Sequence, residues 1–424
     1  MNRRKAITQQ SFLKKLHDVC LGGWFVILLV LLKPIKKIYL APLHSSRIGH
    51  FVMDTEVLLA RIHHDQLKKN SKLYVIWFAD SLICNKFVYN IWQGKLRVIP
   101  YSRLASAIFS SAIILEKIIR IRLTYNYNAW DGYLQDLHLL ETSPRVFEIS
   151  PESEEECFTI LESQGIDITK KWICIAERNS THLELYQPDK KWGFNDYRNT
   201  DISSYLEAAE YVASKGIYCF RMGNTKSKIL TSTHTNLIVD YCNSSWRSDK
   251  LDIFLSLNCL FFLGTASGLS AVPIASRKPL LDVNLAQPLH AIRSKQNHMF
   301  ILKKFIDKVT SLPINLHDYL SIGERGGFTV DNPRHLRSQD LEEFNVLIVD
   351  NSSEEILEVT KEMLALLSIS NQEAPKISAE QMEFWRVFPN TKNFYQSGPI
   401  KSRIGQKFLL ANSHLLKSNG NVNV

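Results

Sequence analysis

Short apolar runs of strand length alternate with segments of helical spacing, and this alternation constrains the fold more than any other feature of the chain. The runs predict strands at 36–43, 72–79, 95–101, 171–177, 217–223, 236–241, 259–264, 278–284 and 345–350. The segments between them predict helices that include 105–123, 150–167, 201–216 and 252–258, and a capping box of Ser352 and Glu355 opens another. This alternation indicates an α/β fold in which helices cover both faces of parallel sheets.

The chain, with 424 residues, is long enough for two domains that each bury a core. We expect two tandem Rossmann-like, doubly wound domains, an N-terminal one over 36–165 and a C-terminal one over 166–370. A membrane-proximal helical segment over 1–35 precedes them. A tail over 371–424 is expected to pack back on the core.

The segment Val19–Leu32 is apolar and lies between basic residues. A helix that spans a bilayer needs about 20 apolar residues, which is more than this segment has. We expect a helix that lies on the cytoplasmic leaflet of the inner membrane, held there by Trp24 and the flanking lysines. A helix buried on the protein's own core and a short single-span anchor are the alternatives.

Charge and cysteine usage restrict the partners and the compartment. A net charge of +9 and a pI of about 9.0 suit an anionic partner. The basic residues are spread along the chain and no nucleic-acid-binding motif is present, so we expect no nucleic acid partner. The seven cysteines form no C-x-x-C pair, which is typical of reduced thiols in the cytoplasm.

Several catalytic motifs are absent from the sequence. It has no G-x-G-x-x-G after a strand, no P-loop, no H-E-x-x-H and no cysteine or histidine cluster with zinc spacing. It also lacks a G-x-S-x-G elbow and a D-x-D flanked by apolar strands. We therefore expect no cofactor and a site that works without a metal.

Basic and small residues follow the predicted strands. Ligands of parallel sheets bind beyond the carboxyl ends of the strands. Residues 45–50 follow the first predicted strand, and Arg178, Asn179 and Ser180 follow the strand at 171–177. Arg221 and Gly223 come at the end of the next strand, and the small-residue turn 264–268 ends the strand at 259–264. Backbone amides in such a turn bind anions, so we expect a phosphate there, close to the arginines. The alternatives are a turn that only serves packing, arginines paired with carboxylates, and a His50 that only caps a helix.

Several longer stretches resemble a family of bacterial glycosyltransferases associated with surface-polysaccharide assembly, including lipopolysaccharide and O-antigen. They are SSRIGHFVMDTEVLLAR (45–61), the segment 191–223 with YRNTDI and RMG, the segment 239–284 with GTASGLS, DNSSEEILEVTKEML (350–364) and SRIGQKFLLANSHLL (402–416). The resemblance implies a two-domain GT-B-like fold, a nucleotide-sugar donor and a glycan or lipid-linked acceptor. The chain departs from it at CIAERNS (174–180), where Glu177 and Asn179 replace a His and an Asp and Arg178 is kept.

The resemblance and the strand-end residues together give each candidate a role. The donor is expected to bind in the C-terminal domain, and the acceptor in the N-terminal one, on either side of an interdomain crevice. His50 is the first choice for the base, Glu56 the second, and Asp54 a weaker one. Arg47, Gly49, Arg198 and Asn199 are expected to contact substrate, while Asp201 is mainly structural. The expected donor-binding residues are Arg178, Arg221, Gly223, Gly264, Thr265, Ser267, Gly268 and Leu269.

Two other functions fit the same sequence. A sugar-nucleotide epimerase of the same fold would convert its nucleotide sugar without an acceptor. A non-catalytic glycan-binding or assembly protein would keep the fold and lack turnover, and the altered AERNS segment favours it.

Overall fold

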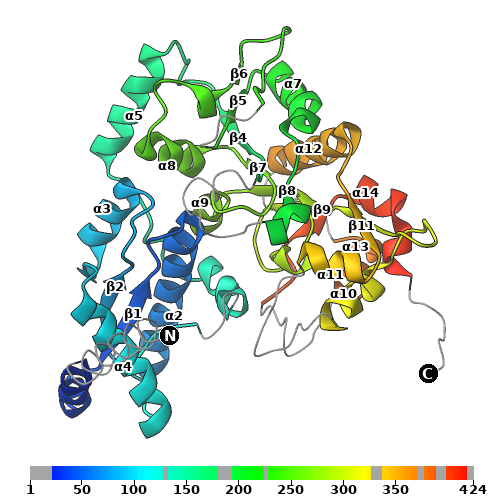
Figure 1. Cartoon of the computed structure of the whole chain (residues 1–424). Coiled ribbons are helices and arrows are strands. Elements are labelled where there is room, and N and C mark those ends of the chain that lie inside the picture. The colour runs from blue at the N-terminus through cyan, green and yellow to red at the C-terminus, as the bar shows by residue number, and fades with distance from the viewer. Residues whose placement is uncertain are drawn as a thin grey trace, which may run out of the picture. The chain divides into compact units, whose positions relative to one another are not determined.

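A computed structural model describes residues 22–127, 132–179, 193–223, 228–325, 337–369, 377–387 and 398–417 (Figure 1). The chain divides into two compact units. Unit 1 comprises Met1–Asn128 and Thr142–Glu148, and unit 2 comprises Ala129–Glu141 and Ile149–Val424. The basic residues before position 22 and the strand-end residue Ser180 lie outside the described residues.

Unit 1 is built on a parallel sheet in the order β1-β2-β3, formed by β1 (Ile38–Leu43), β2 (Tyr74–Ala79) and β3 (Arg97–Ile99). A parallel bridge from Leu40 to Thr124 extends it beyond β1. A π-helical turn η1 (His50–Asp54) continues directly into α2 (Thr55–Lys69), which leads to β2. The helices α3 (Lys86–Lys95) and α4 (Arg103–Ile119) begin at the side-chain caps Asn85 and Ser102.

Residues 22–32 are also helical and belong to unit 1. This N-terminal helix packs on α4 through Val26 and Leu29, which join Ile108 and Ala112 in one apolar cluster on the sheet. No helix among the described residues combines the length and apolarity that crossing a bilayer requires.

Unit 2 contains a seven-stranded sheet in which every neighbouring pair is parallel, in the order β12-β9-β8-β7-β4-β5-β6. The strand order therefore reverses between β4 and β7, as it does in doubly wound α/β folds. The strands are β4 (Trp172–Ala176), β5 (Tyr218–Arg221), β6 (Ile238–Val239), β7 (Phe262–Gly264), β8 (Leu280–Leu285), β9 (His298–Leu302) and β12 (Arg403–Ile404).

Alternate residues of β4 face opposite sides of this sheet, as strand geometry requires. Ile173 and Ile175 lie in the main core with side chains of α7 (Leu206–Ser214) and α12 (Ser353–Ser368). Trp172 packs against Phe254 of α8 (Asp249–Asn258), with ring centroids 5.9 Å apart. Helices thus cover both faces, and the predicted α/β class with parallel sheets is confirmed.

The remaining elements of unit 2 surround this sheet. The capping box of Ser352 and Glu355 forms as predicted at the start of α12. Two strands form a separate antiparallel pair, β10 (Lys304–Asp307) with β11 (Val346–Val349), so the strand expected at 345–350 stays outside the parallel sheet. The other helices are η2 (Gly132–Glu141), α5 (Pro151–Ser163), η3 (Gly193–Arg198), η4 (Ile202–Tyr205), η5 (Tyr241–Asn243), α9 (Ala271–Ala275), η6 (Pro288–His290), α10 (Leu316–Arg325), α11 (Ser338–Glu343), α13 (Ala379–Val387), α14 (Gln406–Ala411) and η7 (Ser413–Leu416).

Candidate active site

The carboxyl ends of β4 and β7 lie side by side at the point where the strand order of unit 2 reverses. In doubly wound sheets, ligands bind beyond the carboxyl ends of the two strands at such a point. The segment after β4 contains Glu177, Arg178 and Asn179, and the turn after β7 runs from Thr265 to Ser270. The candidate site of unit 2 is built on these two connections.

Two arginines join the two connections through the short helix η3. Arg178 Nη1 donates hydrogen bonds to the carbonyl oxygen of Asn195 at 3.1 Å and to Asn199 Oδ1 at 2.7 Å. Arg198 Nη2 donates to the carbonyl oxygen of Ala266 at 3.0 Å. Within the described residues neither guanidinium forms an ion pair with a carboxylate, although the charge of Asp196 acts on Arg178 from nearby.

Lys303, which directly follows β9, adds a third cation to this cluster. Its Nζ donates to the carbonyl oxygens of Tyr197 at 3.0 Å and Asn199 at 2.7 Å, and it pairs with Asp350 at 2.7 Å. Burial lowers the pKa of Lys303, and the charges of Arg178 and Arg198 act in the same direction. Burial lowers the pKa of Arg178 to about 9, with a further contribution from Arg198. Arg178 and Lys303 are thus partly buried cations close to other positive charges, and an anionic ligand would stabilise their charged forms.

The turn after β7 divides into a structural part and an accessible part. Gly264 is buried, and a Cβ at this position would lie 2.7 Å from the carbonyl oxygen of Ala176, so the missing side chain serves the packing of β7 on β4. Thr265 Oγ1 donates to the carbonyl oxygen of Asn284 at 3.2 Å and is also buried. The expectation that Gly264 and Thr265 contact the donor is therefore corrected to a structural role.

The second half of this turn has unused hydrogen-bonding groups. Ser270 Oγ accepts from the Ser267 amide at 3.2 Å and donates to its carbonyl oxygen at 2.7 Å, which closes the turn. The Ser267 hydroxyl is buried and has no hydrogen-bond partner among the described residues. Gly268 is exposed, and neither its amide nor that of Leu269 donates to the main chain in that part of the structure.

Arg221 does not point to an open site. Its side chain is only 1% exposed, and its guanidinium binds Glu177 Oε1 at 2.9 Å and Asp240 Oδ1 at 3.3 Å. Glu177 Oε1 also accepts from Asn179 Nδ2 at 3.2 Å. The expected contact of Arg221 with phosphate is therefore corrected to a buried ion-pair network. Glu177 and Asn179, the two residues that depart from the pattern of the resembled family, belong to this network.

Gly223, another expected donor-binding residue, adopts a positive φ of 140° close to the Cys242 sulfur.

Unit 1 contains a histidine and a carboxylate one helical turn apart. His50 Nδ1 lies 2.8 Å from Asp54 Oδ2, and both residues belong to η1 beyond the carboxyl end of β1. Donation from Nδ1 to the carboxylate leaves the lone pair of the imidazole on Nε2, which is the arrangement of a general base. A π-helical turn inside a helix is often found at functional sites.

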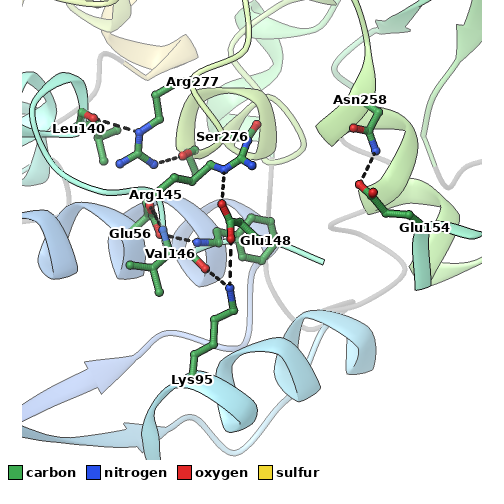
Figure 2. Close-up of polar contacts among 12 residues, drawn as sticks. Glu56, Lys95, Leu140, Arg145, Val146, Glu148, Glu154, Asn258, Ser276 and Arg277 are labelled. Carbon is green, nitrogen blue, oxygen red and sulfur yellow. Dashed lines mark hydrogen bonds and ion pairs between the residues drawn. The ribbon is translucent and has the colours of Figure 1, made fainter. Parts of the chain in front are cut away.

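Glu56 has a structural position in unit 1. Its side chain is buried, Oε1 accepts from the Val146 amide at 2.9 Å and Oε2 accepts from the Phe147 amide at 3.0 Å (Figure 2). This carboxylate attaches the segment Thr142–Glu148 to α2. Since both oxygens bind main-chain amides, we correct the expectation of Glu56 as an alternative base.

A second histidine pair lies beside the first. His44 Nδ1 is 3.9 Å from Asp80 Oδ1, and the rings of His44 and His50 are 6.3 Å apart. Ser46 donates to Asp80 Oδ2 through its hydroxyl at 2.9 Å and through its amide at 3.3 Å. Arg47 is half-buried, which lowers its pKa, and Gly49 lies in the helical turn before η1.

The sequence interpretation missed three residues of these sites, namely Lys303, His44 and Asp80. The apolar run 299–302 before Lys303 is a strand signal that would have placed the lysine at the same sheet edge as Arg178. Within the described residues, no group of three or more His, Cys, Asp or Glu side chains is placed to hold a metal ion.

No family model and no curated protein matches the sequence. Among solved structures, a glycosyl transferase family 9 protein from Veillonella parvula is 12% identical, with a TM-score of 0.44 over 78% of this chain and 97% of the other. The ADP-heptose lps heptosyltransferase II of E. coli is 10% identical, with a TM-score of 0.35 over 62% and 90%. The E. coli heptosyltransferase WaaC with ADP-2-deoxy-2-fluoro heptose is 12% identical, with a TM-score of 0.32 over 62% and 92%. At these identities and TM-scores the likeness assigns no activity to this chain.

Proposed function

We propose that this protein is a GT-B-like glycosyltransferase that moves a sugar from a nucleotide-activated donor to a glycan or lipid-linked acceptor in bacterial surface-polysaccharide assembly. One observation carries the proposal. Arg178 and Arg198 lie at the strand-order reversal of a doubly wound sheet, beside a turn of small residues, and have no carboxylate partner in the described part of the chain. The sugar-transfer chemistry is supported by the sequence resemblance.

The cations of unit 2 suit a diphosphate leaving group. When the bond between the sugar and the phosphate breaks, negative charge develops on the phosphate oxygens. Arg178, Arg198 and Lys303 supply positive charge where this happens, so the site works without a metal. Ser267 Oγ and the amides of Gly268 and Leu269 supply neutral donors. Because burial weakens the screening of these charges by water, each contact is stronger than it would be on the surface.

The base is assigned to unit 1. In a transfer that inverts the anomeric centre, His50 Nε2 takes the proton of the acceptor hydroxyl as that oxygen attacks the sugar carbon. Asp54 holds the ring through Nδ1 and stabilises the imidazolium that forms. Arg47 and Asn199 are proposed to contact the acceptor and the donor sugar, respectively. A lipid-linked acceptor is consistent with a peripheral contact of the N-terminal helix with the cytoplasmic face of the inner membrane.

Calorimetric titration with UDP, GDP, CMP, dTDP and ADP tests the donor site. We expect one nucleotide to bind, and the double variant R178A/R198A to weaken its affinity about 100-fold or more, since each hydrogen bond to a charged group is worth on the order of 1.5–3 kcal/mol. The matched control is R145A, which removes a half-exposed arginine of unit 1 (Figure 2). Failure of all five nucleotides to bind would reject the donor site and favour a non-catalytic protein.

The matching nucleotide sugar is then incubated with the protein, with and without extracted membrane glycolipid. Transfer to the lipid fraction is the expected result. Conversion of the nucleotide sugar without any acceptor would instead show an epimerase.

A further inference from the structure

Helix α4 presents a line of residues with the spacing of a helix-packing seam. Leu104, Ala107, Ser111, Ile114 and Ile118 recur at intervals of three and four, so they share one face of the helix. Ala107 and Ser111, in the middle of the line, are buried. Leu104, Ile114 and Ile118 are exposed, with 49% exposure for Ile114 and 71% for Ile118. Something therefore covers the middle of the seam and leaves both ends open.

The N-terminal helix covers the middle. A Cβ on Gly22 would lie 2.7 Å from the main-chain carbon and oxygen of Ala107, so the two helices approach closely at this point. Figure 1 shows this helix, at the blue end of the chain, beside α4. Val26 and Leu29 extend the contact onto the adjoining face of α4, where they lie in one buried cluster with Ala105, Ile108 and Ala112. The open ends of the α4 seam therefore flank the N-terminal helix within unit 1.

The rest of the N-terminal helix is apolar and exposed. Trp24 is 74% and Leu31 69% exposed, and other large apolar side chains are exposed with them, namely Phe25, Ile27, Leu28 and Leu32 of the helix and Ile35 in the turn that follows it. With the exposed Leu104, Ile114 and Ile118 of the neighbouring helix α4, these side chains make up what we call the two-helix surface. Apolar surface of this extent on a protein marks a place of interaction.

Cations border the two-helix surface. Lys36 follows Ile35, Arg103 precedes Leu104, and Lys117 and Arg120 flank Ile118. All four are exposed and none has an ion-pair partner among the described residues. The neighbouring carboxylate of Glu116 is occupied, because it accepts hydrogen bonds from the amides of Leu123 and Thr124.

We propose that the two-helix surface binds an anionic lipid bilayer, with α4 as an integral part of it. The proposal rests on the peripheral membrane contact proposed above and adds the second helix and the lipid charge. A border of unpaired lysines and arginines complements anionic headgroups, with each basic residue near such a surface contributing measurably to binding. A second copy of the chain would instead place these like charges against each other, and lysine is depleted in protein–protein interfaces. Trp24 suits the headgroup level of the bilayer.

Vesicle flotation of the full chain without any substrate tests the proposal. We expect binding to vesicles of phosphatidylcholine and phosphatidylglycerol that exceeds binding to phosphatidylcholine alone and weakens with added NaCl. The double variant I114S/I118S keeps the N-terminal helix intact and should lower the partition coefficient about tenfold, since two apolar side chains leave the lipid contact. K117E/R120E should remove most of the preference for anionic vesicles.

The matched control is L67S, which removes a side chain that is 68% exposed on α2 of the same unit. It should bind vesicles as the unmodified chain does, and all variants should keep the unmodified melting temperature. Unchanged binding of I114S/I118S would overturn the role of α4. If the unmodified chain were a dimer that bound no vesicles, and I114S/I118S dissociated that dimer, the surface would bind a second copy of the chain instead of a bilayer. Because no sugar transfer is measured, failure here leaves the donor-site titrations unaffected.

Discussion

Arg221 and Glu177 form an ion pair inside unit 2, with 2.9 Å between Arg221 Nη2 and Glu177 Oε1. Asp240 completes the network from the other side. Removing one member of a buried network leaves the others charged and unpaired, which costs about 3–5 kcal/mol. R221A should therefore lower the melting temperature of the protein by roughly 10 °C. R145A removes an arginine from its half-exposed ion pair with Glu148 and should change the melting temperature little. Calorimetric melting of both variants checks this, and equal melting temperatures would contradict it.

Two glycines provide a matched test of packing. In G264A the new Cβ meets the Ala176 carbonyl oxygen, which belongs to the rigid main chain of β4, so we expect a loss of about 1–3 kcal/mol. In G94A the new Cβ meets nothing within 4 Å, and alanine favours a helix, so stability should stay the same or rise by up to about 1 kcal/mol. Urea unfolding of the two variants measures the difference. A G264A protein as stable as G94A would refute the structural role of Gly264.

The Ser267 hydroxyl is predicted to bind ligand. S267A should weaken binding of the cognate nucleotide by about 10-fold or more, because a hydrogen bond to a charged oxygen is lost. Its melting temperature should remain unchanged, since that hydroxyl has no partner within the described residues. S276A is the control, because the Ser276 hydroxyl donates to main-chain oxygens of Val272 and Pro273 within its own helix and turn. If both variants bind nucleotide equally well, the turn does not contact the donor.

His50 and Asp54 are predicted to act on the acceptor. H50Q should lower kcat by roughly 10²–10⁴-fold, because general-base catalysis is lost. D54N should also lower kcat and should shift its pH profile, because the ring is held by a neutral amide instead of a carboxylate. Nucleotide affinity should be unchanged in both variants, which separates the chemical step from folding and donor binding. Wild-type turnover by H50Q would exclude this base.

The pair of His44 and Asp80 predicts a pH dependence of stability. Burial alone would lower the pKa of His44, but Asp80 outweighs it, so the pKa of His44 is raised. The stabilisation is then fully present below the unfolded pKa of about 6.5 and is lost as the pH rises through the raised value. The free energy of unfolding should therefore fall as the pH rises from the unfolded pKa of about 6.5 through the raised pKa of His44. H44Q should flatten this part of the curve, whereas H64Q, at an exposed position on α2, should not. An unchanged slope in H44Q would count against the pair.

The helix and strand periodicity of the sequence predicted the α/β class because that class depends mainly on where apolar residues recur. The same argument placed Arg178 just beyond the carboxyl end of a strand, where the structure has it, whereas Arg198 was singled out only through the resemblance and lies at the end of η3. The sequence could not show that Arg221 is buried in ion pairs while Arg178 is not, since both arginines come at the ends of predicted strands. Their difference arises from Glu177 and Asp240, which reach Arg221 only in the folded sheet.

Gly264 illustrates another limit of sequence reasoning. A glycine at the end of a strand fits either a ligand or a neighbouring main chain, and only the distance to Ala176 decides between them. The strand β12 was missed because it has only two residues, which is too short for a periodic signal, and β9 was missed although the apolar run 299–302 marks it. With β9 missing, Lys303 could not be recognised as part of the cation cluster.

The path of the chain between the two units has a practical consequence for protein engineering. Because Ala129–Glu141 belongs to unit 2 while Thr142–Glu148 returns to unit 1, neither unit is one continuous stretch of sequence. A chimera that exchanges unit 2 with the corresponding part of another protein therefore needs more than one junction. A fragment of unit 2 that starts after Glu148 would lack η2, and a fragment of unit 1 that stops before Thr142 would leave the Glu56 carboxylate without the amides it binds.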